Sequence, residues 1–247
     1  EVTIIQKLLE DSKKINKKIN IFCMVNCRNP YILKNCNFNI VEKFDINNLN
    51  DTLNKYMPIN IDFAIIGPEA PLLQGYSDYL ESLNIPCIGP LKIYAQIETS
   101  KLYCRNILEE LNLNYLSPSF SVINKNSNKE TITEILNNFP DKIVIKKDGL
   151  HSGKGVYVQD VDFVCKDDVI NMCAHNEENI LIEEKLIGEE FSLMTLSDGS
   201  NFRHFPPIQD YKRLNNGDIG PNTGGMGAII DSNNTLPFLN KDNIDYV

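Results

Sequence analysis

The sequence IQDYKRLNNGDIGPNTGGMGA, residues 208–228, concentrates five glycines beside two aspartates, a lysine and an arginine. Glycine destabilises helices and strands alike, so we expect a loop here that passes close to a ligand. Backbone N–H groups that glycine leaves accessible, together with Lys212 and Arg213, suit an anionic small molecule. The alternative interpretation is a flexible surface loop that binds nothing.

The composition restricts the partners of the protein. The chain has 247 residues, enough for one large or two small domains, and a net charge of −9. Such an acidic chain is a poor general surface for nucleic acid or for an anionic membrane. No apolar run is long enough to cross a bilayer and no signal peptide is visible, which favours a cytoplasmic protein.

The cysteines favour the same compartment. There are seven, an odd number, without the spacing of a disulfide framework. Cys23, Cys27 and Cys36 could be read as a metal cluster, but no histidine lies near them in the sequence. We expect reduced thiols, partly buried among apolar residues.

Hydrophobic periodicity predicts alternating helices and strands in the first part of the chain. The expected order is a helix over the first residues, strands at 19–25 and 38–41, a helix at 46–56, a strand at 61–66, a helix at 72–83 and a strand at 87–88. This alternation favours a parallel sheet with ligands at the carboxyl ends of its strands. Glu69 follows one such strand and suits sugar hydroxyls, unless it is only a helix N-cap.

The pattern changes near Lys92 and predicts a small α+β module. The expected helices are 99–111, 131–138 and 166–175, and the expected strands are 119–123, 142–146, 156–159, 180–184, 190–197 and 201–205. The loop DGLHSGKG, residues 148–155, joins two of these strands. It is not a P-loop, because three residues rather than four separate Gly149 from Gly153-Lys154 and no helix follows.

Such a glycine loop can instead fold over a triphosphate, with Lys146 at the end of the preceding strand. Further on, the segment IEEKLIGEE, residues 182–190, runs from a strand into an extended linker. Its backbone groups suit an adenine edge, and Glu190 suits ribose hydroxyls. The alternative is a solvated acidic face.

In this order, several segments resemble the glycinamide ribonucleotide synthetases (phosphoribosylamine–glycine ligases) of the ATP-grasp superfamily. They are IIGPEAPLLQG, IPCIGP, TSK, VIKKDGLHSGKGV, ILIEEKLIGEEFS and QDYKRLNNGDIGPNTGGMGA. The resemblance implies an α/β chain: a Rossmann-like, parallel-sheet (pre-ATP-grasp) domain at 1–91 and an α+β ATP-grasp region at 92–247. A lid subdomain is expected at about 116–187, with the start of the C-terminal ATP-grasp half after it.

The resemblance also implies a reaction of purine biosynthesis. ATP phosphorylates the carboxylate of glycine, and the amine of 5-phosphoribosylamine attacks the glycyl phosphate to give glycinamide ribonucleotide, ADP and phosphate. The residues implied at ATP are Lys101, Lys146, Ser152, Gly153, Lys154, Gly155, Glu183, Leu186, Glu190, Lys212 and Asn222. Those implied at the two substrates are Glu69, Asp210, Arg213, Thr223, Gly224, Gly225, Met226 and Gly227. Lys146, Asp210 and Arg213 are implied in catalysis.

The chain departs from the family pattern at several points. Lys185 replaces an aromatic or aliphatic residue, and Tyr211 replaces a histidine. Glu1 matches the glutamate of the Arg-Glu-His that ends the family's N-terminal glycine-rich phosphate loop, so the loop itself is missing, and nothing after Ala228 resembles the family's magnesium ligands. We therefore expect a chain truncated at both ends and inactive alone, with Mg²⁺ or Mn²⁺ bound by residues outside it.

Three functions are compatible with these observations. The first is the ligase just described, which in this family can be fused to other purine-pathway domains. The second is an ATP-grasp ligase for another carboxylate and amine, which substrate profiling would distinguish. The third is a non-catalytic nucleotide-binding fragment, which a downstream Glu-x-Asn metal site would exclude.

Overall fold

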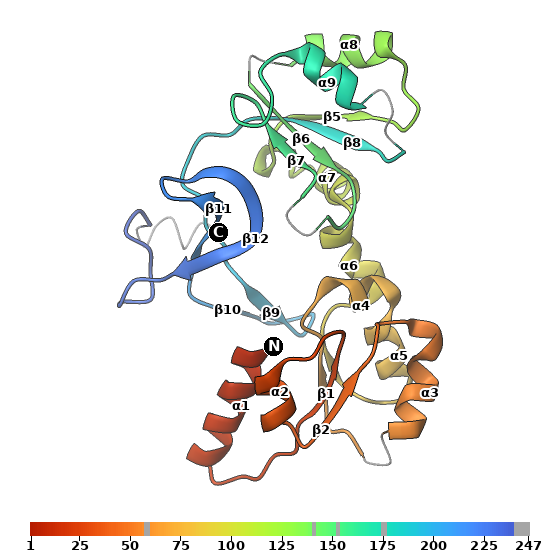
Figure 1. Ribbon diagram of the computed structural model, residues 1–247, viewed down its shortest axis with the longest axis vertical. Coiled ribbons are helices and arrows are strands. Elements are labelled where there is room, and N and C mark those ends of the chain that lie inside the picture. Colours follow the sequence, from red (N-terminus) through yellow and green to blue (C-terminus); the bar gives the residue numbers. More distant parts are fainter. Residues whose placement is uncertain (57–59, 140–141, 152–153, 174–176, 240–247) are drawn as a thin grey trace. The chain divides into compact units, whose positions relative to one another are not determined.

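The chain folds into two compact units. The computed structural model describes residues 1–56, 60–139, 142–151, 154–173 and 177–239. The units comprise residues 1–99 and 100–247 (Figure 1). The sequence places a boundary after residue 91, whereas in the structure helix α6 (Lys92–Thr99) belongs to the first unit.

The first unit alternates helices and strands, as the sequence predicts. Its elements are α1 (Val2–Lys14), β1 (Phe22–Val25), α2 (Pro30–Asn35), β2 (Phe38–Val41), α3 (Ile46–Tyr56), β3 (Ala64–Ile65), α4 (Glu69–Gln74), α5 (Tyr76–Ser82), β4 (Cys87–Ile88) and α6. Strands β1 and β2 pair in parallel, and so do β3 and β4. The predicted parallel arrangement is confirmed.

The core of this unit lies between α3, α5 and the strands. Leu49 and Leu53 from α3 pack with Tyr76 and Leu80 from α5, and all four are buried. The periodicity of 3.6 residues per turn places these apolar side chains on one face of each helix.

One predicted helix is wrong in this unit. The expected helix at 72–83 is two helices, because Gly75 between them adopts φ +87°. This left-handed conformation ends α4, and glycine accepts it without a steric cost. The sequence also missed α6, which is partly apolar on its exposed side: Ile93, Tyr94 and Ile97 are all exposed.

The second unit is built around a four-stranded antiparallel sheet. Its elements are α7 (Lys101–Glu110), the 3₁₀ helix η1 (Asn114–Leu116), β5 (Phe120–Ile123), α8 (Lys129–Asn137), β6 (Ile143–Lys147), β7 (Val156–Val158), α9 (Lys166–Cys173), β8 (Ile180–Glu184), β9 (Thr195–Ser197), β10 (Phe202–His204), β11 (Gln209–Asn215) and β12 (Ile219–Ile229). The strand order is β5-β8-β6-β7. Helices α8 and α9 cover one face of the sheet (Figure 1).

The expectation of a loop at residues 208–228 is wrong. Strands β11 and β12 form an antiparallel hairpin over most of this stretch, with Gly217 in the turn between them. Its register shifts twice, between Tyr211 and Arg213 and between Arg213 and Asn215. Glycine weakens a strand without forbidding it, and such irregular pairing accommodates Gly220 at φ +86°.

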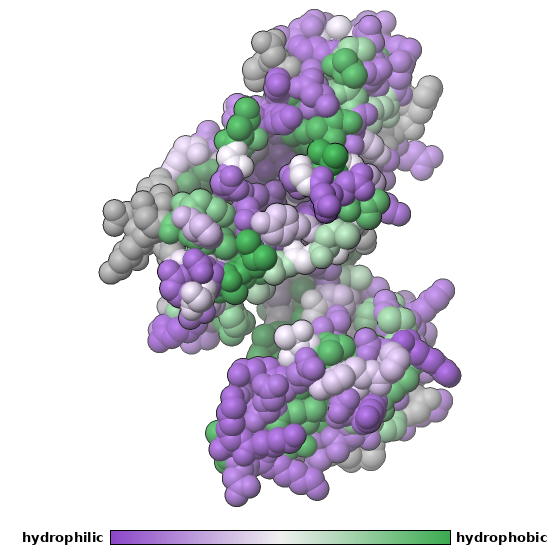
Figure 2. Space-filling view, turned by 60° about the vertical axis from the view of Figure 1, so that its left-hand side comes forward, coloured by the Kyte–Doolittle hydropathy of each residue, from purple (hydrophilic) through white to green (hydrophobic). Residues whose placement is uncertain are grey.

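The hairpin presents apolar side chains on the molecular surface. Figure 2 shows such apolar patches, in green, interrupting the hydrophilic surface. On the hairpin, the exposed large apolar residues include Leu214, Ile219 and Met226.

Candidate nucleotide site

The two faces of the β5–β8 sheet have different chemistry. Ile143 and Ile145 of β6, with Ile180 and Ile182 of β8, point into the core beneath α8 and α9. Side chains alternate along a strand, so the residues between them face the other side. Lys146 and Glu183 lie on that side, on adjacent strands in which Lys146 pairs with Leu181 and Val144 with Glu183.

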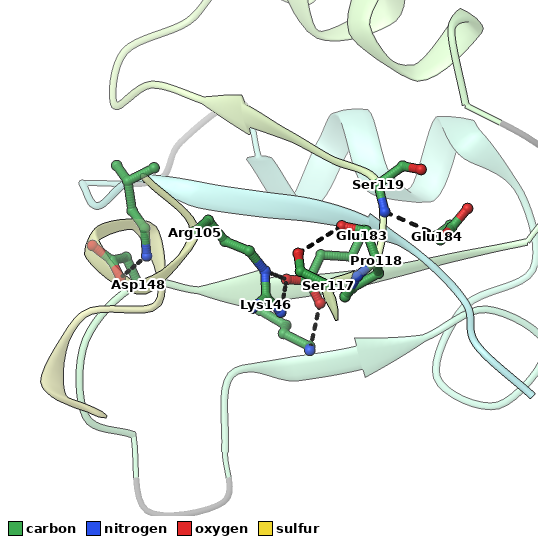
Figure 3. A network of polar contacts seen from close by, with 9 residues as sticks. Arg105, Ser117, Pro118, Ser119, Lys146, Asp148, Glu183 and Glu184 are labelled. Atoms are coloured by element: carbon green, nitrogen blue, oxygen red, sulfur yellow. Dashed lines mark hydrogen bonds and ion pairs between the residues drawn. The ribbon is translucent and has the colours of Figure 1, made fainter. Parts of the chain in front are cut away.

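On this face, two cations share one buried carboxylate (Figure 3). Arg105 of α7 donates from Nε and Nη2 to Glu183 Oε1 at 2.8 and 2.7 Å. Lys146 Nζ lies 2.5 Å from Glu183 Oε2. The side chain of Glu183 is 1% exposed, against 17% for Arg105 and 28% for Lys146. The cluster has one positive charge in excess, and its cations are partly open to solvent.

Arg105 is a site residue that the sequence analysis missed. The available signal was its position four residues after Lys101 in the predicted helix, which places both side chains on one helix face. Glu183 was expected to meet adenine through its backbone. In the structure its backbone lies in the central strand, paired with Phe120 on one side and Val144 on the other.

The glycine loop begins directly after β6. Ser152 and Gly153 lie outside the described residues. Lys154 is exposed and its N–H donates to His151 O, while Gly155, at φ +78°, accepts a hydrogen bond from Lys147 N at 2.8 Å. Lys101 Nζ donates to Gly149 O at 2.8 Å and so contacts the base of this loop.

The linker after β8 is exposed at the position expected for adenine. Leu186 and Ile187 are 67% and 89% exposed. Lys185, a departure from the family pattern, donates to Gln159 O at 3.2 Å and so fastens the end of β8 to the end of β7. This contact gives Lys185 a local structural role.

Lys212 joins two of the predicted site residues. Its Nζ lies 3.0 Å from Glu190 Oε1 and 3.1 Å from Asp210 Oδ2. Burial lowers the pKa of Lys212, but the hydrogen bonds to Glu190 and Asp210 outweigh it, and the pKa is raised overall. Asp210 Oδ1 is buried and accepts no hydrogen bond from the described residues.

The rest of the predicted substrate-binding stretch lies on the β11–β12 hairpin. Arg213 Nη1 donates to Gly220 O at 2.9 Å, and Asn222 stands opposite Arg213 in the register. Thr223 Oγ1 donates to Lys212 O and accepts from Gly225 N. Gly224, Gly225, Met226 and Gly227 are exposed strand residues. Tyr211 donates to Gln209 Oε1 at 3.2 Å.

Glu69 lies in the first unit. It is exposed, at the first residue of α4, and the N-cap position is Pro68. The carboxylate therefore stands in the first turn, where it complements the helix dipole, and not at the N-cap.

The remaining sequence interpretations concern metals, thiols and membranes. Within the described ranges, no group of three or more His, Cys, Asp or Glu side chains is arranged around a common metal position. Cys23 Sγ and Cys36 Sγ are 3.3 Å apart as free thiols, and Cys27 is exposed. Burial, together with the hydrogen bond to Cys36, raises the pKa of Cys23 to about 12. No helix in the described part of the chain is long and apolar enough to span a membrane.

The fold and the family matches define the class of protein. Residues 99–247 match the ATP-grasp (A) domain of phosphoribosylglycinamide synthetase, and residues 1–98 match the N domain of the same enzyme. The second unit is thus an ATP-grasp module. The chain belongs to the phosphoribosylglycinamide synthetase family, which confirms the resemblance found in the sequence.

Curated relatives carry the same name at moderate identity. The chain is similar to phosphoribosylamine–glycine ligase from Methanococcus vannielii, at 36% identity over 94% of this chain and 53% of that protein. It is 38% identical to the enzyme of that name from Methanocorpusculum labreanum, over 74% of this chain and 42% of that one. The chain spans about half the length of these relatives.

Solved structures show the same fold. The crystal structure of phosphoribosylamine–glycine ligase from Thermotoga maritima matches 81% of this chain and 47% of that one, with a TM-score of 0.62 and 27% identity. An ADP complex of N5-carboxyaminoimidazole ribonucleotide synthetase matches 84% of this chain and 51% of that one, with a TM-score of 0.59. At 17% identity, the latter likeness concerns the fold alone.

Proposed function

We propose that this chain provides the N domain and the nucleotide-binding part of a ligase that joins glycine to 5-phosphoribosylamine. ATP phosphorylates the glycine carboxylate, the amine displaces phosphate from the acyl carbon, and the products are glycinamide ribonucleotide, ADP and phosphate. The family membership and the names of the relatives support this reaction. In the cell, the reaction belongs to purine biosynthesis in the cytoplasm.

The observation that carries the proposal is the pair of cations on Glu183. Arg105 and Lys146 converge on Glu183, on the sheet face opposite the helices. A nucleotide phosphate brings negative charge to cations that are already positioned, so little reorganisation is needed on binding. Catalysis in phosphoryl transfer depends mainly on such positioning and charge neutralisation.

The roles of the other residues follow from the family pattern and remain proposals. Lys101, Ser152, Gly153, Lys154 and Gly155 belong to the phosphate end of the nucleotide. Leu186, in the exposed linker, belongs to adenine, Glu190 to the ribose, and Lys212 and Asn222 to the far side of the nucleotide, while Glu183 holds the two cations. The proposed substrate residues are Glu69, Asp210, Arg213, Thr223, Gly224, Gly225, Met226 and Gly227, with Lys146, Asp210 and Arg213 acting in catalysis.

A divalent metal, Mg²⁺ or Mn²⁺, would neutralise charge on the γ-phosphate in such a reaction. Among the described residues, no group of three or more His, Cys, Asp or Glu side chains is arranged to hold a metal ion. We assign no step to a metal held by these residues, and from the family pattern we expect its ligands in a segment that nothing after Ala228 resembles. Because the chain spans about half the length of its relatives, we expect it to bind nucleotide by itself and to need the remaining part for turnover.

Nucleotide binding and ligation can be tested separately. Calorimetry with ADP should show binding by the chain, and Lys146→Met should weaken it at least about tenfold, because a charge-assisted hydrogen bond is lost. Lys142→Met is the matched control, since Lys142 precedes the same strand and pairs with Asp160 at an exposed position. Unchanged ADP affinity in Lys146→Met would contradict the proposed site.

The ligation assay measures ADP release with glycine and freshly prepared phosphoribosylamine. It compares this chain with a longer protein that also contains the segment corresponding to the other half of its relatives' length. We expect turnover only in the longer protein, and only with glycine among small amino acids. Equal activity with another carboxylate substrate would favour an ATP-grasp ligase of different specificity.

A further inference from the structure

The carboxylate of Asp148 binds the N-terminus of helix α7. Asp148 is the first residue after β6, and its Oδ1 accepts a hydrogen bond from Leu102 N at 3.2 Å. Ser100 Oγ lies 3.2 and 3.1 Å from its two carboxylate oxygens and accepts in turn from Tyr103 N. The first N–H groups of a helix have no partner within the helix, and here Asp148 and Ser100 satisfy two of them.

The next residue of the loop is held by the same helix. Lys101 Nζ donates to Gly149 O at 2.8 Å, and Gly149 adopts φ +92°. The backbone of Asp148 is fixed as well, because its N–H donates to Asn179 O and its carbonyl accepts from His151 Nε2. The base of the glycine loop is therefore bound on several sides, one of which is the first turn of α7.

This clamp connects the two elements that carry the cations of the candidate site. Lys146 lies on β6, two residues before Asp148, and Arg105 lies on α7, about one helical turn after Lys101. The clamp thus joins the strand that carries one cation to the helix that carries the other (Figure 3). Because Asp148 and Ser100 accept from Leu102 N and Tyr103 N, these two N–H groups of the first turn of α7 are not available to a nucleotide phosphate.

We propose that Asp148 is a positioning residue for the nucleotide phosphates. Without touching the ligand, it fixes the start of α7 against the end of β6, and so sets the spacing of Arg105 and Lys146. This inference rests on the proposed function, in which these two cations bind phosphate. It gives Ser100 and Lys101 a share in the same clamp.

A purely electrostatic effect of Asp148 and a positioning effect predict opposite changes in nucleotide affinity when Asp148 is removed. The sign of the measured change therefore tests the inference. Asp148 is a negative charge close to a site for anions, and its removal by itself strengthens the binding of a polyphosphate. Loss of positioning instead weakens binding, because the cations no longer converge on one ligand.

The experiment measures the affinities of ADP and adenosine by calorimetry in the purified protein and in three variants. Asp148→Ala should weaken ADP about tenfold, the scale on which lost supporting contacts act. Asp148→Asn, whose amide oxygen can still accept from Leu102 N, should lose less. Adenosine affinity should stay within about twofold in both, since the clamp acts on the phosphate end.

Asp162→Ala is the matched control. This carboxylate accepts a hydrogen bond from Val158 N at 2.8 Å at the end of β7, and its removal changes the net charge equally. Unchanged or tighter ADP binding in Asp148→Ala, or an equal loss of adenosine, would overturn the positioning role. Absence of ADP binding by the unsubstituted protein would overturn the proposed function itself, and the positioning role with it.

Discussion

Replacing Glu183 by Gln should destabilise the second unit far more than the same change at its neighbour Glu184. The Glu183 side chain is almost fully buried and pairs with both Arg105 and Lys146. Breaking a buried ion pair by removing one partner costs about 3–5 kcal/mol, because an uncompensated charge remains. Since both cations are partly exposed, water can replace some of the lost contact, and we expect the lower end of that range.

Glu184 offers a matched control on the same strand. Its Oε1 accepts one hydrogen bond, from Ser119 N at 3.2 Å, and a glutamine can keep that contact. Glu184→Gln should therefore change the free energy of unfolding by about 0.5 kcal/mol or less. For a protein of this size, about 3 kcal/mol lowers the melting temperature by roughly 6–12 °C, which circular dichroism during heating resolves readily.

A third variant distinguishes a charge effect from a packing effect. Replacing Arg105, Lys146 and Glu183 together by methionine removes all three charges while keeping similar volumes. Buried ion clusters can be replaced by apolar residues at little cost, so this variant should recover most of the stability that Glu183→Gln loses. Equal melting temperatures for Glu183→Gln and Glu184→Gln, or a triple variant less stable than Glu183→Gln, would refute the reasoning.

Three further predictions concern other parts of the chain. Lys146→Ala should weaken ATP and leave AMP nearly unchanged, whereas Glu190→Ala should weaken both, because its proposed partner is the ribose; equal losses of AMP and ATP in Lys146→Ala contradict the assignment. The pKa of Cys23 is raised to about 12 in the folded state, so its thiol stays protonated there at a pH where the same thiol ionises in the unfolded chain. The free energy of unfolding should therefore fall as pH rises from about 9 towards 12. Urea unfolding across this range should show the decline, and Cys23→Ser should flatten it. Gly220→Ala should destabilise the hairpin by about 1 kcal/mol or more, because φ is +86° and a Cβ would lie 2.7 Å from Asn215 Nδ2. Gly224→Ala should leave the melting temperature unchanged, because a Cβ there meets no atom within 4 Å, and it should reduce ligation if a ligand passes close to this glycine.

Local sequence patterns predicted much of the fold. The bounds expected for β2 (Phe38–Val41), α3 (Ile46–Tyr56) and β8 (Ile180–Glu184) match the structure, because each is a continuous apolar or amphipathic run between polar or turn residues. The β11–β12 hairpin could not be found in this way. Its strands are stabilised by pairing with each other, and their glycines obscure the alternation that marks a strand.

In the candidate site, the sequence likewise identified some residues, while their contacts depend on the fold. Lys146 could be located from the sequence because it ends a predicted strand next to a glycine loop. Arg105 shares a predicted helix face with Lys101, but its contact with Glu183, 78 residues away, could not be predicted, because only the folded sheet brings the two together. For Glu183, the sequence identified the residue, whereas the contacts of its side chain depend on which face of β8 is covered by helices.

The first turn of α7 also limits how this family of chains can change length. Lys101 contacts the glycine loop and Arg105 contacts Glu183. The two residues are about one helical turn apart, so both contacts are made from the same face of the helix. Deleting one residue between them would rotate Arg105 by about 100° around the helix axis and draw it back by about 1.5 Å. We therefore expect insertions and deletions among homologues to fall elsewhere, for example in the exposed turn between β11 and β12, and to be absent between these two positions.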